Sequence, residues 1–143
     1  MRRYNRLSDI SPLIYVVDDN PSVAIALRRL LHSWGMQVRT FASGEEFLAA
    51  LSRSHDVDCS VIDVQMPGMT GLEVQERMKR AGMDVPVIFI TAHEEEGTEE
   101  NALRAGAVGF LRKPFTDDAL VGLIRTALQH QRKPASSRAA PGE

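Results

Sequence analysis

An apolar run that ends in a carboxylate and is cut off by a turn most constrains the fold of this chain. Residues 61–64 are rich in β-branched side chains and carry Asp63, and Pro67-Gly68 follows at once. Short β-branched runs are typical of buried strands, and proline next to glycine favours a turn. The pattern therefore predicts a strand that places Asp63 at an edge of a sheet.

Three other apolar runs have the same form. They end in Asp18-Asp19, in Thr91, and in Arg112-Lys113-Pro114. Runs that are apolar throughout favour parallel strands covered on both faces. The carboxyl ends of parallel strands share one edge, where open α/β sheets bind their ligands. We therefore expect three carboxylates, a hydroxyl and an ammonium to meet at that edge.

Segments with helical periodicity and capping signals separate the runs. The expected N-caps are Asn20 before Pro21, Ser43, Thr70 and Thr116. Strands are expected at residues 13–18, 36–41, 58–64, 85–91 and 107–111, each followed by a helix. This alternation predicts the α/β class, with a single doubly wound, five-stranded parallel sheet. Periodicity leaves the strand order open.

Length and charge bound the organisation. The chain has 143 residues, enough for one domain with a core, and its net charge of -2 argues against nucleic acid or an anionic membrane as the main partner. No apolar run approaches the roughly 18 residues of a membrane span. The apolar run after the basic amino end is too short for a signal peptide, and the single cysteine cannot form an internal disulfide, so a cytoplasmic location fits best. We expect a flexible leader at residues 1–11, the domain at 12–130 and a disordered or linker tail at 131–143.

Gathering Asp18, Asp19 and Asp63 requires a counter-charge. Two like charges about 4 Å apart repel by roughly 4 kcal/mol at an effective dielectric of 20. Few, partly hydrated oxygen ligands suit Mg²⁺, with Mn²⁺ as a possible substitute, and such a metal allows phosphoryl transfer onto a carboxylate. Lys113, the Thr91 hydroxyl and the Ala92 backbone N–H could then bind the phosphoryl oxygens.

These residues resemble the receiver domains of two-component response regulators over about residues 12–130. The motifs are Val17-Asp18-Asp19, Asp63-x-x-Met66-Pro67-Gly68-x-x-Gly71, Ile90-Thr91-Ala92 and Lys113-Pro114-Phe115. The resemblance implies the flavodoxin-like strand order 2-1-3-4-5 and a signalling role rather than that of an enzyme. It implies that Asp63 accepts phosphate from a histidine kinase, with Mg²⁺ held by Asp19, Asp63 and the Gln65 backbone carbonyl, and by Asp18 through water.

The resemblance also implies moving parts. Phe110 takes the place of the family's switch aromatic, which turns inward when Thr91 moves, and Lys113-Pro114 should be a cis bond. The fourth and fifth helices are the expected face for a phosphorylation-driven homodimer.

The receivers of LuxR-type (FixJ/NarL-like) transcription regulators are the most similar, on residues 35–51 and 105–111. About a dozen residues follow the last expected helix, too few for a helix-turn-helix unit, so we expect no direct nucleic-acid binding by this chain. It is either a stand-alone receiver or one cut at its linker.

Three other functions can be compared with the sequence pattern. An aspartyl-phosphate phosphatase needs an Asp-x-Asp pair, which neither Asp18 nor Asp63 begins. A flavin-binding module would need a phosphate loop rich in Ser, Thr or Gly after the first strand, where Asp18-Asp19 would repel phosphate. A degenerate receiver that serves only as a scaffold stays open, although all five site positions are retained.

A few residues lie outside the motifs. Trp34 and the lone Cys59 are expected in the core, and His93 is the only histidine near the site. The run Glu94-Glu95-Glu96 places negative charge near a loop that must close on a dianion. We predict that it alters the lifetime of the phosphorylated state, and unchanged dephosphorylation after all three become glutamine would refute this.

Overall fold

Five parallel strands alternate with five helices in the computed structural model, which describes residues 11–54, 56–93 and 95–139. The strands are β1 (Leu13–Val17), β2 (Gln37–Phe41), β3 (Cys59–Asp63), β4 (Val87–Thr91) and β5 (Gly109–Arg112). The helices are α2 (Pro21–Ser33), α3 (Gly44–Arg53), α4 (Gly71–Arg80), α5 (Thr98–Arg104) and α6 (Asp117–Ala139). Apart from Ser11, the predicted leader lies outside the described residues.

The strand order is β2-β1-β3-β4-β5, and every neighbouring pair is parallel. This confirms the predicted class and the order that the resemblance implies. β3 pairs with β1 on one side and with β4 on the other, so it lies at the centre of the sheet. The end of β3, which carries Asp63, is therefore flanked by the ends of β1 and β4.

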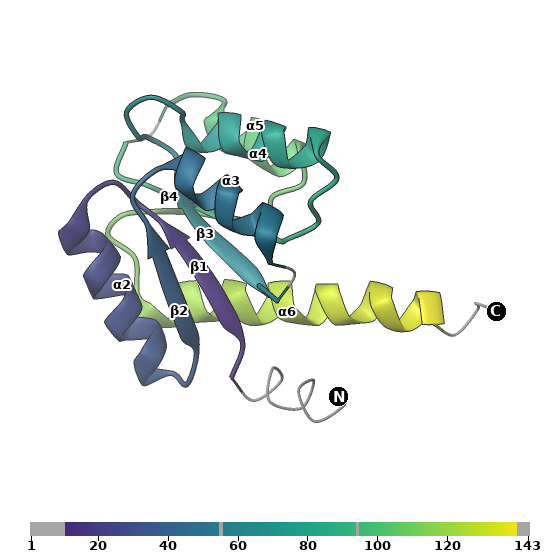
Figure 1. The fold of residues 1–143 in the computed structure, drawn as a ribbon. Helices are drawn as coiled ribbons and strands as arrows, with labels where there is room; N and C mark the ends of the chain where they lie inside the picture. Colours follow the sequence, from purple (N-terminus) through teal and green to yellow (C-terminus); the bar gives the residue numbers. More distant parts are fainter. Residues whose placement is uncertain (1–10, 55, 94, 140–143) are drawn as a thin grey trace.

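Helices cover both faces of the sheet (Figure 1). Alternate residues of β1 point to opposite faces, because Tyr15 and Val17 pack with α3, α4 and α5, whereas Ile14 and Val16 pack with α2 and α6. All four side chains are buried. Coverage of both faces explains why the strands are apolar throughout rather than alternating.

The predicted N-caps are confirmed. Each cap oxygen accepts a backbone N–H: Asn20 Oδ1 from Ser22 at 3.0 Å, Ser43 Oγ from Glu46 at 3.1 Å, Thr70 Oγ1 from Glu73 at 3.2 Å and Thr116 Oγ1 from Ala119 at 3.1 Å. Thr70 and Glu73 form a complete capping box. Short polar residues thus fix where four of the helices begin.

Trp34 is not in the core, contrary to the prediction. It is the C-cap of α2 and 39% exposed, and its ring lies 5.3 Å from the guanidinium carbon of Arg125. Leu31 is the last fully buried residue of the helix. The helical periodicity that predicted burial no longer holds for Trp34, because the helix ends at Ser33. By contrast Cys59 is buried as expected, and burial raises the pKa of its thiol to about 12.

Every strand differs from its predicted bounds by one or two residues at one end at least, and the last helix is longer than predicted. β5 begins at Gly109 rather than at residue 107, because the Ala107 N–H closes the end of α5 by donating to Ala102 O at 3.0 Å. α6 continues to Ala139, through residues expected to form a disordered or linker tail. Extending an existing helix costs far less than starting one, which composition alone does not indicate.

Within the described residues, no helix combines the length and apolarity needed to cross a bilayer.

Candidate functional site

Three carboxylates meet at the carboxyl edge of the sheet, as predicted. Asp18 and Asp19 follow β1 directly, and Asp63 is the last residue of β3. One carboxylate oxygen from each lies within 4.8 Å of the others. Asp18 and Asp63 are buried, whereas Asp19 is exposed. The cluster is therefore open to solvent on the Asp19 side.

The loop after β1 fixes the orientation of Asp18. The Asp18 N–H donates to Phe41 O at 3.0 Å, and its Oδ1 accepts the Asn20 N–H at 2.9 Å. Asn20 in turn caps α2, so the start of that helix and the position of the carboxylate are set together. The Oδ2 atom of Asp18 is left to face the site.

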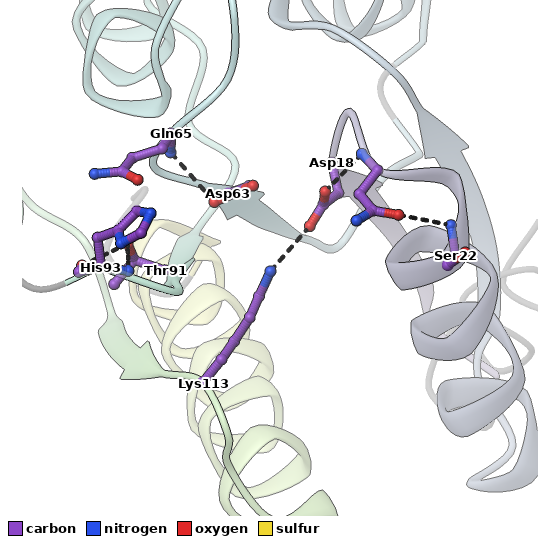
Figure 2. A network of polar contacts seen from close by, with 8 residues as sticks. Asp18, Ser22, Asp63, Gln65, Thr91, His93 and Lys113 are labelled. Carbon is purple, nitrogen blue, oxygen red and sulfur yellow. Dashed lines mark hydrogen bonds and ion pairs between the residues drawn. The ribbon is translucent and has the colours of Figure 1, made fainter.

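Lys113 follows β5, an edge strand of the sheet, and its side chain extends to the Asp18 carboxylate. Its Nζ lies 3.5 Å from Asp18 Oδ2 (Figure 2), although β3 and β4 separate β1 from β5 in the sheet. Its backbone N–H donates to Thr91 O at 2.8 Å, which fixes the base of the side chain. The Lys113-Pro114 bond is cis, as the resemblance implied.

The Asp63 carboxyl is held in an unfavourable environment for a negative charge. Burial, and then the nearby Asp18 charge, raise its pKa to about 6, against the opposing effects of the Gln65 N–H and Lys113. The Gln65 N–H donates to Asp63 Oδ1 at 3.2 Å (Figure 2). A cation bound beside these carboxylates would reduce this repulsion.

Gly71, the first residue of α4, packs directly against the backbone of Asp63 and Val64, which the sequence motif did not reveal. Its N–H donates to Val64 O at 2.8 Å. A Cβ at this position would lie 2.6 Å from Asp63 O and 2.9 Å from Val64 Cα, so only glycine allows α4 to begin this close to β3. Gly71 is part of the motif that begins at Asp63, and this packing explains why glycine stands there.

The Thr91 hydroxyl is engaged with its own loop. Thr91 is buried at the end of β4, and its Oγ1 donates to His93 O at 2.8 Å and accepts the His93 N–H at 3.2 Å (Figure 2). Ala92 is exposed between these two residues. To bind a group on Asp63, the hydroxyl must first give up its bond to the His93 carbonyl.

Phe110 lies on the sheet face that α3, α4 and α5 cover. It is half-buried, its ring centroid is 6.4 Å from that of Phe89, and the Arg112 guanidinium carbon is 5.9 Å from its centroid. Arg112 also forms an ion pair of 2.7 Å with Glu99 of α5.

The donor set fits a hard divalent cation. Mg²⁺ prefers a few carboxylate oxygens and keeps several waters, and here three carboxylates converge on a site with one open side. The Gln65 carbonyl belongs to the loop that contacts Asp63 through its N–H. The sequence identified Asn20 only as a helix cap, and its backbone N–H also holds the Asp18 carboxylate.

Comparison with known proteins gives a consistent result. Residues 14–125 match the family model described as "Response regulator receiver domain". The chain is 42% identical over 123 residues to "Response regulator protein TodT" of Pseudomonas putida, covering 86% of this chain and 54% of that protein. It is 38% identical over 126 residues to "Transcriptional regulatory protein FixJ" of Bradyrhizobium diazoefficiens, covering 88% of this chain and 61% of that protein.

A solved structure supports the same assignment. A response regulator receiver protein from Burkholderia phymatum is 50% identical with a TM-score of 0.73, covering 83% of this chain and 96% of that one. The chain thus spans nearly the whole of a solved receiver but little more than half the length of the curated relatives it matches.

Proposed function

The chain belongs to the response regulator receiver domain family, whose members are signalling domains of two-component phosphorelays rather than classical enzymes, and on that premise we propose that Asp63 is its phosphoacceptor. A sensor histidine kinase supplies the phosphoryl group. An Asp63 oxygen forms a bond to phosphorus while the bond between phosphorus and the kinase histidine nitrogen breaks, and that nitrogen keeps the electron pair. The product is an aspartyl phosphate.

The observation that carries this proposal is the placement of Asp63 between like charges and a cation. Asp18 and Asp19 lie within 4.8 Å of it, and the Lys113 ammonium reaches the same cluster. We assign Lys113 to the developing phosphoryl charge, because its side chain ends beside the acceptor and its backbone is held by β4. The Thr91 hydroxyl and the Ala92 N–H take a further phosphoryl oxygen.

Asp18, Asp19, Asp63 and the Gln65 backbone carbonyl would hold Mg²⁺, or Mn²⁺ in its place. When bound, the metal neutralises the carboxylates and a phosphoryl oxygen. Asp18 acts through water in this assignment, since its Oδ1 is already engaged by Asn20 and its Oδ2 by Lys113. Asp19 is exposed and free to reorient toward the cation.

Phosphorylation changes the shape of the domain through Thr91 and Phe110. The Thr91 hydroxyl leaves His93 and binds the phosphoryl group, the space behind it admits the Phe110 ring, and α5, β5 and α6 shift between two packings. This surface then forms a homodimer or binds an effector. The output is transcriptional regulation by a domain outside this chain, the chain itself binds no nucleic acid, and the protein acts in the cytoplasm.

The test is intact-mass analysis after incubation with a small phosphodonor and Mg²⁺. We expect one phosphate on the native protein and none on Asp63→Asn. The matched control is Asp84→Asn, which alters an exposed carboxylate just before β4, at the opposite edge of the sheet, and should retain the phosphate. A native protein that takes up no phosphate would instead favour the degenerate receiver that acts as a scaffold.

Gel filtration of the same samples tests the dimer. A shift to the dimer position with phosphate, and none for Asp63→Asn, is the expected result. A native protein that is phosphorylated but elutes unchanged would contradict the homodimer and leave an effector as the partner.

A further inference from the structure

A buried amide ties together α4 and α5, the helix that follows the Thr91 loop. Gln75 lies on α4 and is 6% exposed, and its Nε2 donates to Ala102 O of α5 at 3.2 Å. Val74 and Met78, which lie near it on α4, and its partner Ala102 are buried apolar residues of the core. A polar side chain is costly at such a position unless it is hydrogen-bonded, so the bond to Ala102 O is what allows Gln75 to be buried here.

α5 has few other means of holding its position. It is the shortest of the described helices, with 7 residues, and Ala102 is its one buried residue. Its N-cap is Gly97 in the left-handed region, with no side-chain cap. Leu103, its one large apolar side chain, is 42% exposed. Because little apolar surface is buried, a single internal hydrogen bond is a large share of what fixes this helix.

The second side-chain contact of α5 is of a weaker kind. Glu99 pairs with Arg112 of β5 at 2.7 Å, with 38% and 44% of the two side chains exposed. Ion pairs this exposed contribute little, because water and salt screen them. The Gln75 hydrogen bond is buried and therefore shielded from water and salt, so we expect it to contribute more than the ion pair to the position of α5.

We propose that Gln75 is a positioning residue that holds α5 in its resting place and thereby sets how readily the phosphoacceptor site is filled. This inference rests on the proposed function. Filling the site requires Thr91 to leave His93, and Gly97, which opens α5, lies only six positions after Thr91 in the chain. Whatever stabilises the resting position of α5 opposes that movement, so the Gln75–Ala102 bond biases the domain toward the unphosphorylated arrangement.

The test replaces Gln75 with methionine, which keeps the length of the side chain and removes the donor. Ala102 O still accepts the Ala107 N–H at 3.0 Å, so no acceptor is orphaned and the fold should persist. We expect amide hydrogen exchange in α5 to become about five-fold faster, the factor that corresponds to a hydrogen bond of about 1 kcal/mol. Exchange in α2 and α6 should not change.

Glu99→Gln is the matched control, because it removes the charge from the exposed ion pair of the same helix. In Glu99→Gln the amide hydrogen-exchange rate of α5 should differ from that of the native protein by less than about two-fold. Unchanged α5 exchange in Gln75→Met would overturn the proposal. If Gln75→Met unfolds, the hydrogen bond can be tested in the native protein by NMR. Slower exchange of the Gln75 side-chain amide protons than of those of Gln65 supports the bond, and equal exchange contradicts it.

A second readout separates this inference from the proposed function. With a limiting phosphodonor and Mg²⁺, Gln75→Met should acquire phosphate about two- to five-fold faster than the native protein. Faster α5 exchange with an unchanged phosphorylation rate would show that the helix is held but not coupled to the site, and would overturn the proposal. If the native protein takes up no phosphate at all, the proposed function fails, and the exchange measurement alone then decides whether Gln75 holds α5.

Discussion

The Lys113 ammonium lies 3.5 Å from the Asp18 carboxylate, although the two residues follow strands that β3 and β4 separate in the sheet. The lysine therefore already supplies part of the positive charge that the three acids require. A metal ion and Lys113 must share the same carboxylates.

We predict that Lys113→Met binds Mg²⁺ more tightly, by about five- to ten-fold, because removing one cation from the cluster strengthens its attraction for another. Phosphate acceptance should fall at the same time, by about a hundred-fold, since the phosphoryl charge loses its ammonium partner. Titration calorimetry measures the first effect and intact mass the second. Lys79→Met, which removes an exposed lysine from the end of α4, should change neither.

The stability of the domain should depend on the ionisation of Asp63. Its pKa is raised to about 6 in the folded protein, above the value of roughly 4 for an aspartate in an unfolded chain. The folded state binds the extra proton between these values, so the free energy of unfolding should fall as the pH rises from about 4 to about 6, and stay lower above.

Asp63→Asn removes this penalty. In metal-free buffer we expect the variant to exceed the native protein by about 1–2 kcal/mol at pH 8 and to differ little at pH 4, a gain smaller than the full pKa shift would give because water reaches the site. Urea denaturation at the two pH values measures it. A variant that is less stable than the native protein at pH 8 would show that Asp63 makes favourable contacts that outweigh the repulsion.

Thr91→Val should separate phosphorylation from switching. Valine keeps the shape of threonine but loses the hydroxyl that bonds to His93 and that we assign to the phosphoryl group. We expect Asp63 still to accept phosphate, while phosphate-dependent changes in α5 hydrogen exchange disappear. Thr91→Ser keeps the hydroxyl and should restore most of the response, and a full response in the valine variant would contradict the role of Thr91.

Gly71→Ala should disturb the site through the backbone. The new Cβ would lie 2.6 Å from Asp63 O, so α4 or the end of β3 must shift. We expect a loss of about 1–3 kcal/mol in stability and weaker Mg²⁺ binding. Gly122→Ala in α6 is the control: its Cβ meets no atom within 4 Å, and alanine favours a helix, so this variant should gain up to about 1 kcal/mol. Equal effects of the two substitutions would contradict the close packing at Gly71.

The glutamate hypothesis remains a prediction. Glu95 and Glu96 are exposed beside the loop that begins at Thr91, and Glu94 lies outside the described residues. Dephosphorylation of the triple glutamine variant is the measurement that decides it.

Local sequence was enough to predict the elements and the strand-end positions of most candidate site residues. β-branched runs, helix caps and turn residues act within a few positions of one another, so Asp18, Asp63 and Thr91 could be placed at strand ends, and Asn20, Ser43, Thr70 and Thr116 at helix starts. The prediction that Trp34 lies in the core was wrong, because helical periodicity does not indicate where a helix stops facing the sheet.

Tertiary structure decided which of these residues touch. Lys113 and Asp18 are 95 positions apart and Gln75 and Ala102 are 27 apart, and no local pattern encodes either contact. Strand order and helix packing set those distances, because side chains remote in the chain meet only once both faces of the sheet are covered. The sequence alone determined which residues stand at the strand ends and helix starts. Packing alone determined three contacts: Thr91 with His93, Lys113 with Asp18, and Gln75 with Ala102.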